Sequence, residues 1–549
     1  MNRKINQDYL KYIFFSFYFL IGVLIYKDYG IGIEEHFQRQ NGFYWLKYFL
    51  SFTNFDDLKL IANTKYENIL ITDPNLPKSD FFNFYGIVFD VPLAFIETFF
   101  NINSSKTYFE IRHLSIFIIF FISTIFFNKI LENRFKYFPA VIFGTIIYII
   151  SPRIFGDSFY NNKDLLFLSF LVIANYFAFK FFENKSTSSL IFFCLFSAVA
   201  TSSRIFGLYL PIIFLIFYFF EYIGKKVKTN DFFKIFCKVL LFYLFFLYLH
   251  YPYIWKLNIL EIKTWLSSFF YFMDYRMLFN GDYFHIKYLP RSYLPIWIFI
   301  TTPLYVILLF LLGAFFTFKR FFVRVVNIKK EIGLSNDLWT STNEKKDLFV
   351  FISFSIFFFY VLFFNVFMVS GWRYFYFLNV FIVYFFSLGL YFLRINLKKY
   401  CNEKFFLTIN FLLTLIIVFD LYKFHPYQSL YFNRIFSANK LEKFQIDTPS
   451  LSRVEALKII LKDSKQDQVH VANTSWTPLR NGQDLLEEKD KKRLIYVGQN
   501  LQKADYIYTN HIYLHKKEIN KRYQIPGNFY KIKVQKINNI EIYSIYKKK

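Results

Sequence analysis

The sequence predicts an all-α polytopic membrane protein that ends in a small α/β domain. Hydrophobic residues make up 55% of the 549-residue chain and aromatic residues 24%, whereas charged residues reach only 19%, against about 25% in ordinary globular domains. Apolar runs of about twenty residues, the length that crosses a bilayer, recur along most of the chain. Near Asp447 these runs stop and shorter mixed patterns begin. The composition excludes a disordered chain, a collagen-like repeat and a disulfide scaffold.

The apolar runs predict about eleven transmembrane helices. The first, residues 12–26, follows a short basic start with Arg3, Lys4 and Lys11. No small-residue cleavage site comes after it, so we expect an uncleaved signal anchor with a cytoplasmic N-terminus. The ten further spans are expected at residues 113–129, 138–152, 165–181, 189–203, 206–223, 234–251, 293–316, 348–369, 374–393 and 406–422.

Residues 84–100 form an apolar segment that we do not count as a span. The segment contains Asp90, Pro92 and Glu97, and ionisable groups in the hydrocarbon core are expensive. A helix in the outer interface is the better interpretation. The loops rich in Lys and Arg then all fall on the cytoplasmic side, as the positive-inside rule requires. These loops are residues 129–136, 180–185, 225–234, 319–346 and 394–404.

The opposite side of the membrane receives the loops 27–111, 153–163 and 252–291. Residues 1–446 form the transmembrane domain, and residues 447–549 are expected to form a small extracytoplasmic α/β domain. Leu451–Leu461 reads as an amphipathic helix in that domain, because its apolar residues keep helical spacing. Five short strands are expected at residues 468–472, 493–497, 504–509, 530–534 and 540–545.

Two adjacent carboxylates, Glu34 and Glu35, lie shortly after the first span. Either residue is a candidate base, since desolvation near a bilayer raises the pKa of a carboxyl group toward the range that a base needs. The alternative is a solvated helix start, where acidic side chains favour the N-terminal end of the helix dipole. Spacing alone favours the helix start.

A polar loop, residues 151–164, connects two nearly pure hydrocarbon spans on the same side. Helix capping by an Asn or Asp explains one of its polar residues but not the whole set. Its candidate functional residues are Asp157, Asn161, Lys163 and Asp164. Two further cations, Arg204 and Arg373, stand alone at the outward ends of spans. They either extend to lipid headgroups or bind a phosphate.

Several short motifs follow one another in a specific order along residues 12–450. They are the acidic pair with Gln38, Arg39, Asn41 and Gly42; Tyr85-Gly86; Arg112-His113; Ser151-Pro152-Arg153 with Ser158 to Asn161 and Lys163-Asp164; Tyr293-Leu294-Pro295 with Thr301-Thr302-Pro303; Gly371-Trp372-Arg373; and His425-Pro426-Tyr427-Gln428 with Tyr431-Phe432-Asn433. In this order they resemble the bacterial branch of the GT-C glycosyltransferases. That superfamily includes the protein O-mannosyltransferases (family 39) and the lipid A aminoarabinose transferases.

The resemblance implies an inverting glycosyltransferase of the bacterial inner membrane that acts in cell-envelope glycosylation. Its donor would be a polyprenyl-phosphate sugar, a hexose or a pentose, and its acceptor a lipid, glycan or protein outside the cytoplasm. Nucleotide sugars are not available on that face, whereas a lipid carrier presents its sugar laterally to the outward loops. In this family the acidic pair usually begins with Asp, where this chain has Glu34. The sequence therefore leaves the base open between Glu34 and Glu35.

The resemblance also implies roles for the remaining candidates in a single displacement. The residues expected to stabilise the departing phosphate are Arg204, Arg373, Arg112 and Lys163. The residues expected to orient the sugar or the acceptor are Asp157, Asn161, Asp164 and His425. Some relatives use a divalent cation and others do not, so a cation at Glu34 or Asp157 is left open.

Two other function classes compete with this interpretation. One is a different membrane transferase or ligase of cell-envelope glycans. A phosphoethanolamine-type enzyme needs a nucleophile and metal ligands in a soluble domain, and His470, His511 and His515 have no acidic partners at ligand spacing. The other is a lipid or polysaccharide transporter, a class that typically shows inverted repeats and charges at mid-membrane depth. Here the charges gather toward the outward face, and the chain has no internal repeat.

The net charge of +26 does not indicate a partner made of nucleic acid. The basic residues are dispersed between hydrophobic runs, and they form neither a basic face nor a known nucleic-acid motif. The three cysteines lie in or beside apolar runs without a metal-binding spacing. We expect them to be buried, inert thiols.

Overall fold

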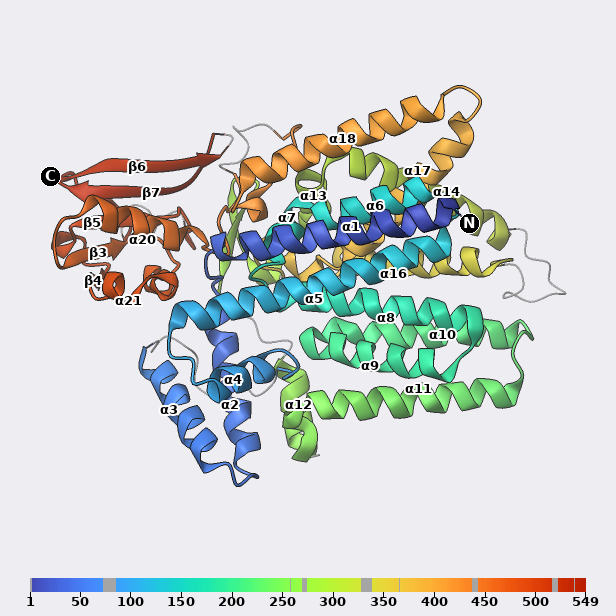
Figure 1. Ribbon diagram of the computed structural model, residues 1–549, viewed down its shortest axis with the longest axis horizontal. Helices are drawn as coiled ribbons and strands as arrows, with labels where there is room; N and C mark the ends of the chain where they lie inside the picture. Colours follow the sequence, from blue (N-terminus) through green and yellow to red (C-terminus); the bar gives the residue numbers. More distant parts are fainter. Residues whose placement is uncertain are drawn as a thin grey trace.

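Long helices run side by side in one bundle, and a sheet-containing C-terminal region lies at the end opposite the N-terminus (Figure 1). The computed structural model describes residues 2–72, 85–256, 258–268, 274–326, 338–364, 366–436, 443–515, 522–537 and 539–549. Parts of the predicted loops 27–111, 252–291 and 319–346, and residue 365 of a predicted span, lie outside the described residues.

The bundle confirms the predicted membrane architecture. Within the described residues, nine helices are long and apolar enough to cross a membrane. These are α1 (Asn2–Ile25), α5 (Ser105–Arg134), α8 (Asp164–Asn184), α10 (Tyr209–Ile223), α11 (Thr229–His250), α14 (Leu304–Val326), α16 (Thr342–Phe363), α17 (Leu378–Leu397) and α18 (Glu403–Phe424). Two shorter apolar helices, α6 (Phe138–Ile150) and α9 (Thr187–Ser203), occupy the two remaining predicted spans.

One predicted span is divided in the structure. Residues 293–316 contain α13 (Tyr293–Thr301) and the first half of α14, with an extended Thr302 between them. Pro303 has no backbone N–H to continue the first helix, and it restricts the residue before it to extended conformations. The membrane-crossing helix therefore begins at Leu304 rather than at Tyr293.

Side-chain caps start several of the long helices. Ser104, Ser186 and Ser341 each accept a hydrogen bond from the backbone N–H three residues later, at the starts of α5, α9 and α16. The side chain of Asn402 accepts from the N–H of Lys404 at the start of α18. These hydrogen bonds satisfy backbone donors that have no partner within the helix.

The segment around residues 84–100 does not cross the bundle, as predicted. Its helix α4 (Asp90–Phe99) has ten residues, and at 1.5 Å per residue it is too short for a bilayer core of about 30 Å. Its carboxylates are paired: Asp90 contacts Arg112 at 2.7 Å, and Glu97 contacts Arg39. The helix packs closely on α2 (Glu35–Leu50), since a Cβ atom at Gly42 would lie 2.4 Å from the carbonyl oxygen of Asp90.

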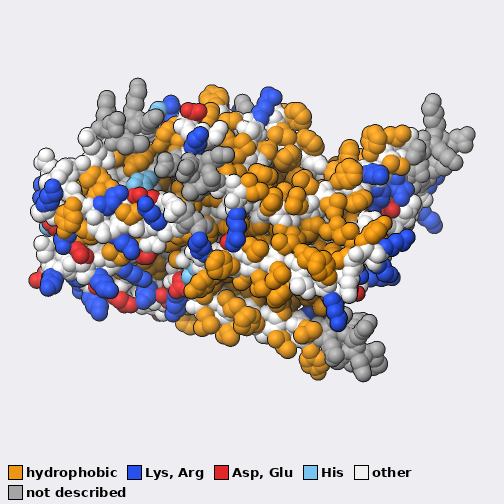
Figure 2. Space-filling view, turned by 90° about the horizontal axis from the view of Figure 1, so that it is seen from above, with side chains coloured by type: hydrophobic (Ala, Val, Ile, Leu, Met, Phe, Trp, Pro, Cys, Tyr) orange, Lys and Arg blue, Asp and Glu red, His pale blue; other side chains and the backbone are white. Residues whose placement is uncertain are grey.

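The basic loops meet at the N-terminal end of the bundle and the polar outward loops at the other end. The C-terminal ends of α5, α8, α10, α14 and α17 share the first end, while α2, α3 (Asp56–Thr72) and α12 (Ile259–Ser268) lie crosswise at the second (Figure 1). Figure 2 shows hydrophobic side chains along the bundle and charged side chains gathered over its two ends.

Buried ion pairs join the helices at the N-terminal end. The carboxylate of Asp347 has a fully buried side chain and contacts Arg134 at 2.7 Å and Arg320 at 2.9 Å. Glu221 contacts Lys185 at 2.6 Å and Lys345 at 2.7 Å. A buried charge is tolerated when it is paired and hydrogen-bonded, so these contacts hold α5, α10, α14 and α16 in register.

The C-terminal region has the predicted helix and all five predicted strands. Helix α20 (Ser452–Asp463) lies at the predicted amphipathic segment. The strands are β3 (Val469–Asn473), β4 (Leu494–Gly498), β5 (Tyr506–Thr509), β6 (Phe529–Ile537) and β7 (Ile540–Lys548). They form one sheet in the order β4-β3-β5-β7-β6, parallel among β3, β4 and β5 and antiparallel at β7 and β6.

A small hairpin, β1 (Arg276–Phe279) with β2 (Asp282–His285), was not predicted. Asn280 and Gly281 join its strands, and both have positive φ angles, 53° and 97°. Asn-Gly is the turn pair that favours such two-residue hairpin loops. The Asn-Gly dipeptide is the sequence signal that could have predicted this hairpin.

The separation of the loops makes the membrane orientation testable. In a variant without the three native cysteines, we expect an impermeant thiol reagent to label Gln502→Cys in intact spheroplasts and to label Lys226→Cys only after lysis. Both positions are exposed, and they lie at opposite ends of the bundle. Labelling of Lys226→Cys before lysis would reverse the orientation.

Candidate active site

Five charged residues from four segments of the chain meet at the end of the bundle opposite the N-terminus. Glu34 precedes α2, Lys163 and Asp164 begin α8, Arg204 follows α9, and Arg373 precedes α17. Arg373 and Glu34 are 339 residues apart in sequence and in direct contact. We call these five residues the charge cluster.

Asp164 joins the two arginines of the charge cluster. The Nε atom of Arg204 donates to Oδ1 of Asp164 at 2.8 Å, and the Nε atom of Arg373 lies 3.0 Å from Oδ2. A terminal nitrogen of Arg373 also donates to Glu34. The side chain of Asp164 is 2% exposed, whereas that of Glu34 is 34% exposed. Glu34 therefore occupies the side of the cluster that an incoming molecule can reach.

Two tyrosine rings border the cations. The Nζ atom of Lys163 lies 3.5 Å from the centroid of the Tyr85 ring, and the guanidinium carbon of Arg204 lies 4.3 Å from that of Tyr374. Cation–π contacts of this kind hold a cation without neutralising it. Neither tyrosine was among the predicted site residues, although Tyr85 belongs to one of the motifs and Tyr374 follows another.

The pKa values of Glu34 and Lys163 are both lowered in the charge cluster, for different reasons. Burial raises the pKa of Glu34, but the surrounding cations, Arg373 first, outweigh burial and hold this pKa at about 2. Burial and the charge of Arg204 lower the pKa of Lys163 to about 8. Three cations thus face two carboxylates at neutral pH, and the cluster has a net positive charge that suits a phosphate.

A third carboxylate, that of Asp157, adjoins the charge cluster. It ends the short helix α7 (Pro152–Asp157) and accepts hydrogen bonds from the Tyr160 hydroxyl at 2.5 Å and from Nδ2 of Asn161 at 3.0 Å. The same Nδ2 atom lies 3.0 Å from Asp164. Burial raises the pKa of Asp157 to about 6, although the hydrogen bonds from Asn161 and Tyr160 oppose the shift.

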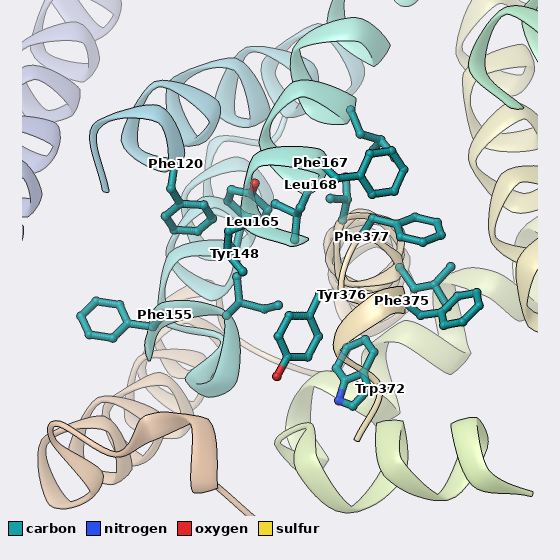
Figure 3. Close-up of a cluster of buried hydrophobic side chains, with 14 of the residues drawn as sticks. Phe120, Tyr148, Phe155, Leu165, Phe167, Leu168, Trp372, Phe375, Tyr376 and Phe377 are labelled. Carbon is teal, nitrogen blue, oxygen red and sulfur yellow. The ribbon is translucent and has the colours of Figure 1, made fainter. Parts of the chain in front are cut away.

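A hydrophobic cluster fixes the segments that carry these groups. Figure 3 shows Leu165, Phe167 and Leu168 from the start of α8 near Phe375, Tyr376 and Phe377 from the segment before α17. The rings of Phe167 and Phe377 meet edge to face with centroids 5.0 Å apart. These contacts hold the residues that follow Asp164 against those that follow Arg373, so ordinary core packing sets the geometry of the ion pair.

Three predicted site residues have other partners. Glu35 is buried, lies 3.1 Å from His113 and accepts a hydrogen bond from the backbone N–H of Gly32 at 2.7 Å. Arg112 is ion-paired with Asp90, and His425 contacts Asp28 at 2.9 Å. The structure thus brings together Glu34, Lys163, Asp164, Arg204 and Arg373, with Asp157 and Asn161 beside them.

The donor set does not fit a resident metal ion. Within the described residues, no group of three or more His, Cys, Asp or Glu side chains is placed to hold one. Of the two predicted candidates, Glu34 contacts Arg373, and Asp157 accepts hydrogen bonds from Tyr160 and Asn161.

Comparison with known proteins confirms the predicted resemblance. Residues 91–254, which include Arg112, Asp157 and Arg204, match the family described as dolichyl-phosphate-mannose-protein mannosyltransferase. The structure of ArnT from Cupriavidus metallidurans bound to undecaprenyl phosphate aligns over 97% of each chain with 9% sequence identity and a TM-score of 0.42. No curated protein sequence matches the chain significantly.

The pKa of Lys163 gives the charge cluster a pH signature. We expect the affinity for a polyprenyl phosphate in detergent to fall as the pH rises through about 8, because Lys163 loses its charge there. In Lys163→Arg this fall should vanish, since arginine stays protonated. Isothermal titration calorimetry measures both proteins from neutral pH upward. An equal pH dependence in the two would exclude Lys163 from phosphate binding.

Proposed function

We propose that this protein is an inverting glycosyltransferase. It moves a sugar from a polyprenyl-phosphate donor to a hydroxyl group of a lipid, glycan or protein on the extracytoplasmic face of a bacterial inner membrane. The observation that carries the proposal is the charge cluster, in which the partly exposed carboxylate of Glu34 lies against the buried Arg373, with Lys163 and Arg204 nearby, at the end of an apolar bundle. The family match over residues 91–254 supports it.

The position of the cluster suits a lipid-linked phosphate. A polyprenyl chain lies in the hydrocarbon region, and its phosphate lies at the interface where the helices end. Arg204 and Arg373 offer planar guanidinium groups that bind phosphate oxygens in pairs. Asp164 contacts both guanidinium groups before a donor arrives. Cations fixed in this way stabilise a departing phosphate without reorganising during the reaction.

Glu34 is the better of the two candidate bases. It adjoins the phosphate-binding cations and is partly exposed, whereas Glu35 is buried against His113. Without donor, Arg373 holds the pKa of Glu34 low. A bound phosphate competes for Arg373 and neutralises part of the surrounding charge, so the pKa of Glu34 rises toward its ordinary range. Donor binding thereby makes Glu34 a stronger base.

The reaction is a single displacement. The acceptor oxygen attacks the anomeric carbon as its proton passes to a carboxylate oxygen of Glu34. The bond between that carbon and the phosphate oxygen breaks, and its electron pair leaves with the polyprenyl phosphate. Attack from the side opposite the leaving group inverts the configuration. Asp157 and Asn161, beside the cluster, orient the sugar or the acceptor.

The proposal is tested with purified protein and polyprenyl-phosphate hexoses and pentoses. We expect one of these donors to release polyprenyl phosphate and to give a product of inverted anomeric configuration, identified by NMR. The glycolipids and glycans of a deletion strain, compared with wild type, identify the acceptor. Absence of release from every donor, together with an unchanged envelope profile, would reject the proposal.

Removing the charge of Glu34 separates catalysis from binding. We expect Glu34→Gln to lower turnover by roughly 10²–10⁴-fold, the usual scale for acid–base catalysis. Its affinity for polyprenyl phosphate should be unchanged or higher, because the carboxylate that competes for Arg373 is gone. Glu34→Asp, which restores the usual family residue, should keep activity. Glu67→Gln is the control, an exposed glutamate on α3. Full turnover in Glu34→Gln would remove Glu34 as the base.

Asp157 should produce the acidic limb of the pH profile. The ionised carboxylate accepts hydrogen bonds from Tyr160 and Asn161. We therefore expect kcat/KM to fall as the pH drops through about 6, where Asp157 becomes protonated. In Asp157→Asn this limb should disappear, with a smaller loss at neutral pH than in Glu34→Gln. A limb that persists in Asp157→Asn belongs to another group.

A further inference from the structure

The segment that carries Glu34 is held from two sides. Residues Gly30 to Glu34 connect the first span to α2. On the side of the bundle, Glu35 accepts the hydrogen bond from the backbone of Gly32 and contacts His113 of α5. The other side of the segment meets the C-terminal domain.

Arg453 of α20 makes the central contact between the two. Its side chain is 0% exposed, and one terminal nitrogen donates to the carbonyl oxygen of Ile31 at 2.8 Å, across 422 residues of sequence. Its other nitrogens donate to the carbonyl oxygens of Ser450 and Pro478, each at 2.8 Å. One buried guanidinium thus joins two segments of the C-terminal domain to the segment before α2.

The backbones of the two parts also touch directly. The N–H of Ile33 donates to the carbonyl oxygen of Pro449 at 3.1 Å. A Cβ atom at Gly30 would lie 2.2 Å from the carbonyl oxygen of Leu451, so this approach needs a glycine. The turn that precedes α20 therefore sets the path of the segment that leads to Glu34.

We propose that the C-terminal domain positions the catalytic base. Arg453 and the turn at residues 449–451 hold the Gly30–Glu34 segment where Glu34 meets Arg373. Arg453 acts through this segment and is a positioning residue. The inference rests on the proposed role of Glu34 as the base. It assigns residues 447–549 a part in the transfer step itself, beyond acceptor choice or assembly.

Arg453→Gln tests the proposal with a matched control. Arg493 is also an arginine that donates to backbone carbonyls, but its acceptors, Leu461, Ser464 and Gln466, all lie within the C-terminal domain. We expect Arg453→Gln to lower kcat by roughly tenfold to a hundredfold, the scale of a misplacement of about 1 Å. Its affinity for polyprenyl phosphate should stay within about twofold, while Arg493→Gln leaves kcat near the wild-type value.

Hydrogen exchange provides a readout that does not depend on activity. The amide of Ile33 donates to the C-terminal domain, so its exchange should accelerate in Arg453→Gln and not in Arg493→Gln.

Gly30→Ala disturbs the same contact from the other side and should also lower kcat and accelerate this exchange. Its control is Gly527→Ala, whose Cβ would meet no described atom within 4 Å. Arg453→Lys, which keeps the cation, should recover part of the lost turnover.

The outcomes separate this inference from the proposed function. Unchanged Ile33 exchange and kcat in Arg453→Gln and Gly30→Ala would overturn the positioning role, as would equal effects in Arg493→Gln. A loss of donor affinity as large as the loss of kcat would also overturn it, because the phosphate cations would then be disturbed. If the wild-type protein transfers no sugar but Ile33 exchange is still faster in Arg453→Gln and Gly30→Ala, the proposed function is rejected. The contact between Arg453 and the Gly30–Glu34 segment is then still supported.

Discussion

The pairing of cations with carboxylates at the end of the bundle opposite the N-terminus constrains the rest of the site. Arg204 and Arg373 come from different helix junctions, and two unpaired guanidinium groups at this depth would repel each other. Asp164 lies between them and contacts both. Because a buried charge is stable only when it is paired, the starts of α8 and α17 and the end of α9 have to meet here. Hydrophobic packing such as that of Phe167 on Phe377 then fixes the junction.

The same principle operates at both ends of the bundle with different results. At the N-terminal end, the Asp347 side chain is fully buried between Arg134 and Arg320, and solvent does not reach its carboxylate. At the opposite end, the side chain of Glu34 is partly exposed and contacts Arg373. The buried ion pairs of Asp347 stabilise the arrangement of the helices. The proposed function requires an accessible carboxylate beside Arg373, because a donor phosphate would replace Glu34 there.

The C-terminal domain is integrated with this site through backbone contacts. Its sheet supports α20, and the turn before α20 contacts the segment that leads to Glu34. Glu34, the proposed base, is thus held between the helical bundle and the C-terminal domain. Such an arrangement suits the proposed reaction, which joins a donor from the membrane to an acceptor outside it, because Glu34 lies where the two parts meet.

Local patterns in the sequence were sufficient for the architecture. Run length and loop charge predicted the eleven apolar helices, and strand patterns predicted the five strands of the C-terminal sheet, because both depend on neighbouring residues. The exclusion of residues 84–100 as a span was correct for the same reason, since a carboxylate in lipid is costly wherever its partner lies. The break at Pro303 and the hairpin at Asn280-Gly281 also have local signals, and both were missed.

The different partners of Glu34 and Glu35 were decided only by the tertiary structure. The two are adjacent in sequence, but successive side chains at a helix start point in different directions, so one faces Arg373 and the other His113. Those partners are 339 and 78 residues away in sequence. Arg453 has no local signal at all, because its acceptor on Ile31 is a backbone carbonyl. Sequence alone determined which helices form and which ends carry charge, whereas helix packing decided which charges meet.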